Sequence, residues 1–204
     1  MEITGQDALI VVDVQNDFCA GGALPVPDGD AVIPVILAIA DRLEHILLTQ
    51  DWHPPGHCSF ASSHPGRKPF DIDPVSGERL WPDHCVQGMR GSEFNPSLQL
   101  SRAELILRKG VRKQIDSYSA FFENDHATPT GLAGYGRERG FRRFFFAGLA
   151  FDFCVGFSAL DARRCGFEAV VIRDACRGID ADESMAMEAK LAGAGVALVE
   201  SRNL

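Results

Sequence analysis

Residues 142–174 read RRFFFAGLAFDFCVGFSALDARRCGFEAVVIRD. The first and last parts, 142–150 and 168–174, are short runs rich in aromatic and β-branched residues, which is typical of strands buried on both faces. Between them, 152–166 has the length of a helix and ends on Gly166, a common helix-terminating residue. A strand, a helix and a second strand in this order predict a right-handed βαβ unit with parallel strands.

The same alternation continues outward along the chain. From about 50 to 103 it is interrupted by a loop-rich, proline-rich segment, and loops of that length in a compact domain are usually functional or disordered. We therefore expect one α/β domain over residues 1–204, with three layers: a mainly parallel six-stranded sheet and helices on both of its faces. The remaining strands are predicted at 8–14, 45–49, 104–109 and 196–201, and the remaining helices at 29–43, 128–140 and 180–195.

Charge and hydropathy exclude several classes of function. The net charge is −8, from 20 basic and 28 acidic residues, and no basic stripe is present, so nucleic acid and anionic membrane are disfavoured as partners. The longest apolar run, 144–151, is far shorter than the roughly 20 residues that span a bilayer. No positively charged leader precedes the first strand, and a cytoplasmic protein is expected. The oligomeric state stays open, with a homo-oligomer as one option.

The six cysteines are irregularly spaced, which favours reduced thiols over a disulfide framework. One of them stands where chemistry is expected, because ligands of open parallel sheets bind beyond the carboxyl ends of the strands. Asp13 lies at the end of the first predicted strand, Lys109 ends the third, and Cys154 lies in the first turn of the helix after the fourth.

A helix N-terminus or a nearby cation lowers the pKa of a thiol from about 8.5. Lys109 is therefore expected to favour the thiolate of Cys154, and Asp13 can take up the thiol proton and pass it to a leaving group. The alternative interpretation is structural. In that case Cys154 packs in the core, the lysine stem covers apolar surface and the aspartate caps a turn.

A second cluster falls in the loop-rich segment. Residues 50–60, QDWHPPGHCSF, carry an acid and two imidazoles, and a third imidazole follows in LWPDHCVQG, residues 80–88. One oxygen and three nitrogens suit a single divalent ion, with zinc preferred to iron or manganese. Thiols beside the histidines are alternative ligands, and histidines that only make hydrogen bonds are the alternative without a metal. The expected ligands are Asp51, His53, His57 and His84, and the alternative thiols are Cys58 and Cys85.

Aromatic residues near these positions could form the walls of a pocket, although single aromatic side chains more often belong to a core. The candidates are Phe18, Trp81, Tyr118 and Phe121.

Five segments together resemble the nicotinamidases, also called pyrazinamidases, of the isochorismatase-like cysteine hydrolases. They occur in the order of that family and cover nearly the whole chain. The segments are ALIVVDVQNDFCAGGALPV (8–26), LTQDWHPPGHCSF (48–60), WPDHCVQGMRGSEF (81–94), LRKGVRKQIDSYSAFFEN (107–124) and GLAFDFCV (148–155).

This resemblance implies hydrolysis of nicotinamide, and of pyrazinamide, to the acid and ammonia, in NAD salvage. Cys154 would form a thioester, Asp13 would act as the acid and base, and Lys109 would complete the triad. The resemblance also implies a cis peptide between Leu149 and Ala150. The N–H groups of Ala150 and Cys154 would then face an oxyanion.

The resemblance further implies one divalent ion that binds the ring nitrogen of the substrate. Some relatives hold the ion with only three protein ligands, which leaves a direct role of His57 open. The metal positions are Asp51, His53, His57 and His84, and the substrate-binding positions are Phe18, Trp81, Leu149 and Tyr118.

Three other functions are weighed against this one. The first is a related amidohydrolase that acts on a non-pyridine amide. The second is a non-catalytic metal-binding module on the same fold. The third is a zinc hydrolase in which metal-bound water attacks and the cysteine is structural.

Overall fold

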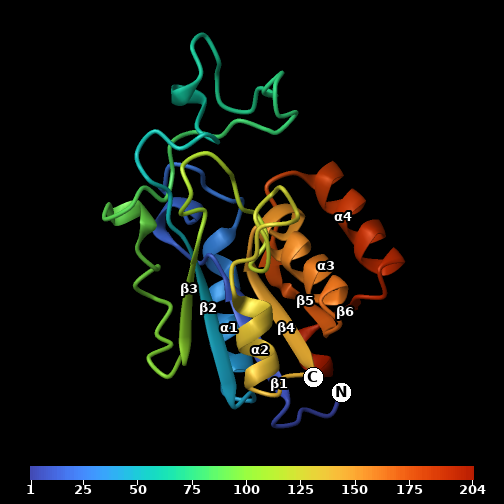
Figure 1. Ribbon diagram of the computed structural model, residues 1–204. Helices are drawn as coiled ribbons and strands as arrows, with labels where there is room; N and C mark the ends of the chain where they lie inside the picture. Colours follow the sequence, from blue (N-terminus) through green and yellow to red (C-terminus); the bar gives the residue numbers. More distant parts are fainter.

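A computed structural model describes all residues 1–204 and contains one sheet of six parallel strands (Figure 1). The strand order is β3-β2-β1-β4-β5-β6, and every neighbouring pair is parallel. The prediction of a mainly parallel six-stranded sheet is thereby confirmed. The strands are β1 (Asp7–Val12), β2 (His45–Asp51), β3 (Leu105–Lys109), β4 (Arg143–Leu149), β5 (Glu168–Arg177) and β6 (Ala197–Val199).

Helices cover both faces of the sheet, which makes the three predicted layers (Figure 1). Because side chains alternate along a strand, Leu9 and Val11 pack on the face covered by α1, whereas Ile10 and Val12 pack on the other. Both faces are buried, which explains why these strands are continuous apolar runs. The helices are α1 (Val32–Ala40) on the first face, and α2 (Leu132–Glu138), α3 (Gly156–Arg164) and α4 (Ala181–Gly193) on the second.

The boundaries differ from the predicted ones mainly after β4. The predicted helix 152–166 starts with a π-helical turn, Phe151–Val155, and only then continues as α3. In this turn the N–H groups of Phe153 and Val155 both donate to the carbonyl of Ala150, at 3.1 and 3.0 Å. Such turns are frequent at functional sites, and this one contains Cys154.

The first part of the loop-rich segment lies beyond the carboxyl ends of the strands, and its last part returns beside β3 to the amino end of that strand (Figure 1). It contains only single 3₁₀ turns and is held by isolated bridges, of His53 with Val86 and of Phe60 with Trp81. Residues 61–80, here called the projecting loop, extend furthest from the sheet (Figure 1). Strand order reverses between β1 and β4, and the carboxyl end of that switch point is where an open parallel sheet binds ligands.

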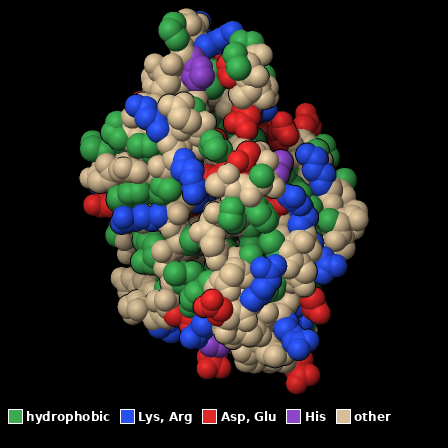
Figure 2. Space-filling model, in the orientation of Figure 1, with side chains coloured by type: hydrophobic (Ala, Val, Ile, Leu, Met, Phe, Trp, Pro, Cys, Tyr) green, Lys and Arg blue, Asp and Glu red, His purple; other side chains and the backbone are tan.

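Acidic and basic side chains are interspersed over the face of the molecule that Figure 2 shows. All six cysteines are free thiols, as the irregular spacing predicts. None of the helices combines the length and hydropathy that crossing a membrane requires.

Candidate active site

The three residues predicted at the strand ends meet around one ammonium group. Lys109 Nζ lies 2.9 Å from Asp13 Oδ2 and 3.5 Å from Cys154 Sγ, and it donates to the carbonyl of Ser117 at 2.9 Å. The three side chains are buried. Asp13 directly follows β1 with a left-handed φ of 48°, Lys109 ends β3, and Cys154 lies in the π-helical turn after β4.

A second carboxylate shares the same ammonium. Lys109 Nζ also lies 2.9 Å from Asp51 Oδ1, while the hydroxyl of Thr49 donates to Asp13 Oδ1 at 2.6 Å. Burial alone would lower the pKa of Lys109, but Asp13 and Asp51 together hold that pKa well above its usual value. The lysine is therefore a fixed cation rather than a proton carrier.

Burial raises the pKa of the Cys154 thiol well above its ordinary value; Lys109 opposes the rise, and Asp13 and Asp51 add to it. The prediction of a lowered thiol pKa was therefore wrong for these protein groups by themselves. The main reason is the burial of the sulfur, and the second is that Lys109 is already paired with two carboxylates. Burial likewise raises the pKa of Asp13, against the effect of Lys109. These surroundings favour the protonated thiol of Cys154 over the thiolate.

The site of the predicted metal contains three ligand atoms that face one another. The Nδ1–H group of His53 donates to the carbonyl of Gly110 at 3.0 Å, and that of His84 donates to the carbonyl of Pro82 at 2.8 Å. Since a carbonyl only accepts, these bonds assign the proton to Nδ1 in each ring. Each ring is left with Nε2 as its possible metal ligand, 3.0 and 3.5 Å from Asp51 Oδ2. Two imidazole nitrogens and a carboxylate oxygen that converge in a buried site fit a cation.

Gly110 is required at its position by the closeness of His53. Its φ is +62°, and a Cβ there would lie 2.4 Å from His53 Cε1. A side chain at this residue would displace the imidazole from the carbonyl that fixes its tautomer.

Gln15, which the sequence analysis did not single out, holds the acidic ligand. Its Nε2 donates to the carbonyl of Asp51, and its Oε1 accepts from the N–H of Asp51, both at 2.8 Å. The same Nε2 donates to the carbonyl of Ser92. This buried amide therefore links the residues after β1 with the end of β2.

The structure does not bring His57 into the group of Asp51, His53 and His84. Its ring stacks on that of His53 with centroids 4.2 Å apart, and its Nδ1 lies 2.8 Å from Ser59 Oγ. Its Nε2–H group points to the carbonyls of Arg112 and Ile115, at 3.0 and 3.2 Å.

Ligand atoms of His57 also lie within 4.8 Å of those of His53 and Asp116, but these hydrogen bonds occupy both nitrogens of His57. The geometry therefore makes His57 a support for the loop rather than a fourth ligand to the same ion. Cys58 and Cys85, the alternative thiols, belong to neither group.

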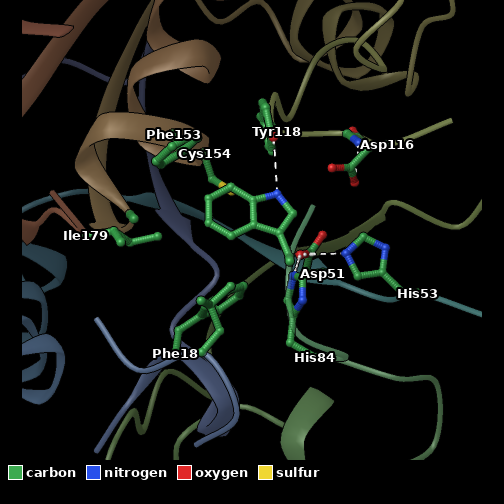
Figure 3. A pocket seen from close by; sticks show the side chains of 13 residues that line it. Phe18, Asp51, His53, His84, Asp116, Tyr118, Phe153, Cys154 and Ile179 are labelled. Atoms are coloured by element: carbon green, nitrogen blue, oxygen red, sulfur yellow. Dashed lines mark hydrogen bonds and ion pairs between the residues drawn. The ribbon is translucent and has the colours of Figure 1, made fainter. Parts of the chain in front are cut away.

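A narrow cavity of about 350 Å³ of empty space, part of it open to solvent, joins the sulfur to the three ligand atoms (Figure 3). In this view Phe153 and Cys154 lie on one side of the cavity and Asp51, His53 and His84 on another. Its lining residues are Phe18, Leu24, Asp51, His53, Trp81, His84, Asp116, Ser117, Tyr118, Ala150, Phe153, Cys154 and Ile179.

The lining includes Phe18, Trp81 and Tyr118, as predicted, but not Leu149. The side chain of Leu149 is fully buried in the core on the face covered by α1. Phe121 likewise belongs to the core, on the opposite face. The peptide bond between Leu149 and Ala150 is cis, as the resemblance implied.

Several lining residues were missed by the sequence reading. Asp116 directly precedes the SYSAFF stretch and so had a local signal, whereas Phe153, beside Cys154 in FDFC, was already expected at the pocket wall from the resemblance. Ile179 follows β5 with no motif around it, and only the tertiary structure places it in the cavity.

Comparisons with known proteins agree with this geometry. Nicotinamidase of Acinetobacter baylyi is 49% identical over 201 residues, covering 97% of this chain and 94% of that protein. PnC1 from L. infantum, solved in complex with nicotinate, superimposes with a TM-score of 0.88 at 40% identity over 99% of this chain and 96% of that chain. Pyrazinamidase of Pyrococcus horikoshii, solved in complex with zinc, gives a TM-score of 0.78 at 34% identity over 96% and 99%.

The family described as Isochorismatase domain matches residues 7–202. This match spans nearly the whole chain and agrees with the parallel sheet and with the residues gathered at its switch point. The chain belongs to the isochorismatase domain family.

Proposed function

We propose that this protein is a nicotinamidase, a hydrolase that converts nicotinamide and water to nicotinate and ammonia, and that it also accepts pyrazinamide. The observation that carries the proposal is the position of the Lys109 ammonium, 3.5 Å from Cys154 Sγ and 2.9 Å from both Asp13 and Asp51. It connects the proposed nucleophile and its base to the group of cation ligands, and both the nucleophile and these ligands line one cavity. An aromatic amide with a ring nitrogen suits both ends of that cavity.

The first half of the reaction releases ammonia. Cys154 Sγ attacks the carboxamide carbon while Asp13 takes the thiol proton, which the raised pKa of the thiol makes necessary. The N–H groups of Ala150 and Cys154 are the candidate donors to the oxyanion. Asp13 then gives its proton to the amide nitrogen, the C–N bond breaks, and ammonia leaves a thioester on the sulfur.

The second half hydrolyses the thioester. Asp13 accepts a proton from water as the water oxygen attacks the carbonyl carbon. The C–S bond breaks, the sulfur regains its proton from Asp13, and nicotinate is released. Lys109 stays protonated throughout, since its pKa lies well above its usual value, and its charge stabilises the carboxylate and the sulfur in turn.

Asp51, His53 and His84 are the residues that would hold a divalent cation. Two imidazoles and a carboxylate suit zinc and also iron, and we propose zinc first because the similar pyrazinamidase of Pyrococcus horikoshii was solved in complex with zinc. When bound, such an ion supplies a Lewis-acid contact for the ring nitrogen of the substrate. Phe18 and Trp81 line the same cavity and would enclose the ring between aromatic walls.

An ammonia-release assay with a matched series of amides tests the proposal. Nicotinamide and pyrazinamide both carry a ring nitrogen meta to the carbon that bears the carboxamide, and pyrazinamide carries a second one in the ortho position. Benzamide has the same shape without a ring nitrogen. We expect kcat/KM for nicotinamide to exceed that for benzamide by at least about 100-fold, because benzamide leaves the cation without its ligand. Equal turnover of benzamide would instead favour the rival function, an amidohydrolase for non-pyridine amides.

A role in NAD salvage follows from the proposed reaction, because nicotinate can re-enter nucleotide synthesis. A cytoplasmic location, the disfavoured nucleic-acid and membrane partners, and a homo-oligomeric state stay predictions of the sequence.

A further inference from the structure

The projecting loop returns to the body of the protein next to the active-site cavity. Its ends are joined by two hydrogen bonds at 2.8 Å, from the N–H of Ala61 to the carbonyl of Trp81 and from the N–H of Trp81 to the carbonyl of Ser59. Trp81 lines the cavity. Arg79 stands two residues before it and is therefore placed at the point where the loop meets the aromatic wall.

The guanidinium of Arg79 contacts three parts of the molecule. Its Nη2 lies 2.9 Å from Glu183 Oε1 in the first turn of α4. Its central carbon lies 5.8 Å from the ring centroid of Trp81 and 5.7 Å from that of Phe153. One side chain thus joins the loop, α4 and the two aromatic rings.

The two rings beneath this guanidinium form one wall of the cavity. Trp81 and Phe153 pack edge to face with centroids 4.9 Å apart, and the indole N–H of Trp81 donates to Tyr118 Oη at 3.2 Å. All three residues line the cavity, whereas Arg79 does not. A second groove, between the projecting loop and α4, is lined by both Arg79 and Glu183.

Stability alone is a weak reason for this arrangement. The side chains of Arg79 and Glu183 are 27% and 42% exposed, and ion pairs with that much solvent contribute little to folding. The contact is instead suited to fixing orientation, because the guanidinium lies within cation–π distance of both rings while Glu183 holds it by an ion pair.

We propose that Arg79 is a positioning residue for the substrate: through Glu183 it fixes the projecting loop on α4, and through its guanidinium it holds Trp81 and Phe153 as the wall against which an aromatic ring binds. This inference rests on the proposed function, since it assigns the wall to a ring-containing amide. Arg79 touches neither the sulfur nor the cation ligands, so its loss should affect binding of the ring and not the chemical step.

Steady-state kinetics with nicotinamide test the inference in the metal-loaded enzyme. For Arg79→Ala we expect KM to rise about fivefold or more while kcat stays within about twofold, because ring binding in the ground state and the transition state weakens equally. Arg79→Lys keeps a charge for Glu183 but loses the broad guanidinium that contacts both rings, and an intermediate KM is expected. Calorimetric titration with nicotinate should show the same order of affinities without turnover.

Arg173→Ala is the matched control. Arg173 Nε lies 2.8 Å from Glu188 Oε1, also on α4, with 34% and 45% exposed side chains, and its guanidinium carbon lies 4.3 Å from the ring centroid of Phe151. That aromatic ring does not line the cavity, so KM should stay at the wild-type value.

Equal KM values in Arg79→Ala and wild type would overturn the positioning role while leaving the proposed function intact. The positioning role would also be overturned if Arg79→Ala lowered both kcat and the thermal midpoint and Arg173→Ala lowered them by the same amounts. A wild-type enzyme that releases no ammonia from nicotinamide would overturn the proposed function, and this inference with it.

Discussion

The strand ends of the sheet and the loop-rich segment contribute to the same cavity in different ways. Asp13 directly follows β1, Lys109 ends β3, and Cys154 lies in the π-helical turn after β4; the three meet around one ammonium. The residues of the loops, such as His84 and Trp81, reach the cavity through isolated bridges and hydrogen bonds. The comparison teaches that the strand ends hold the proposed reactive groups and one cation ligand, whereas the loops supply most of the other groups that would recognise the substrate.

The largest effect is expected from the nucleophile, which tests the first half of this division. Cys154→Ala should lower kcat by at least about 10³-fold, because the thioester cannot form. Ammonia release measures the activity, and elemental analysis should find the metal content unchanged, since the ligands come from other elements. Substantial turnover with bound metal would mean that the strand ends are not the reactive region, and that metal-bound water attacks.

Variants of the two loop histidines His84 and His57 distinguish a metal ligand from a residue that only supports the loop. His84→Ala should weaken metal binding by about 100-fold or more, since even groups outside the ligand shell change affinity by 10–100-fold. His57→Ala should weaken it by about tenfold at most, because both nitrogens of His57 are hydrogen-bonded to protein groups. Competition with a chromophoric chelator measures both affinities. The reverse order would restore His57 as a ligand.

The pH dependence of kcat/KM tests whether Asp13 is the base. Asp13 must be ionised to take the thiol proton, and burial raises its pKa above the ordinary 3.8 against the effect of Lys109. The acid limb of kcat/KM should therefore have its midpoint above pH 3.8, with activity falling about tenfold per pH unit below it.

Thr49→Val removes a hydrogen bond that lowers this pKa, so the acid limb should move to higher pH. An acid limb that stays in place in this variant would argue that another group is the base.

The smallest expected effect concerns stability. Asp180 caps α4 by accepting from the N–H groups of Asp182 and Glu183, at 2.9 and 3.0 Å. Asp180→Ala should lower the free energy of unfolding by about 1 kcal/mol. Asp73→Ala, which removes a similar bond to Ser76 in the projecting loop, should leave the thermal midpoint unchanged because loops open locally. Equal losses in the two variants would show that the loop unfolds together with the sheet.

The same division explains what could be predicted from the sequence. Buried parallel strands are continuous apolar runs, so the sheet and the residues that end its strands were within reach of pattern reasoning. The π-helical turn around Cys154 has no comparable pattern, and neither does the position of Ile179 in the cavity. His57 and Leu149 show the limit most clearly. Only the tertiary structure reveals the hydrogen-bond partners of His57. Only the tertiary structure reveals that the side chain of Leu149 points into the core.

The charge state of the thiol was out of reach for a related reason. Its pKa depends on burial and on how one ammonium is divided between two carboxylates, and sequence spacing reports neither. The cis peptide after Leu149, in contrast, followed from the resemblance of a short motif.

Gln15 fixes the distance between Asp51 and Asp13. Its amide joins the chain just after β1 to the end of β2. Asp51, which would bind the cation, therefore cannot move independently of Asp13, the proposed base for the Cys154 thiol. A rigid spacing between the two ends of the cavity selects among positional isomers. Isonicotinamide carries the same atoms as nicotinamide with the ring nitrogen moved by one position. It can therefore place its carboxamide at Cys154 or its ring nitrogen at the cation ligands, but not both at once.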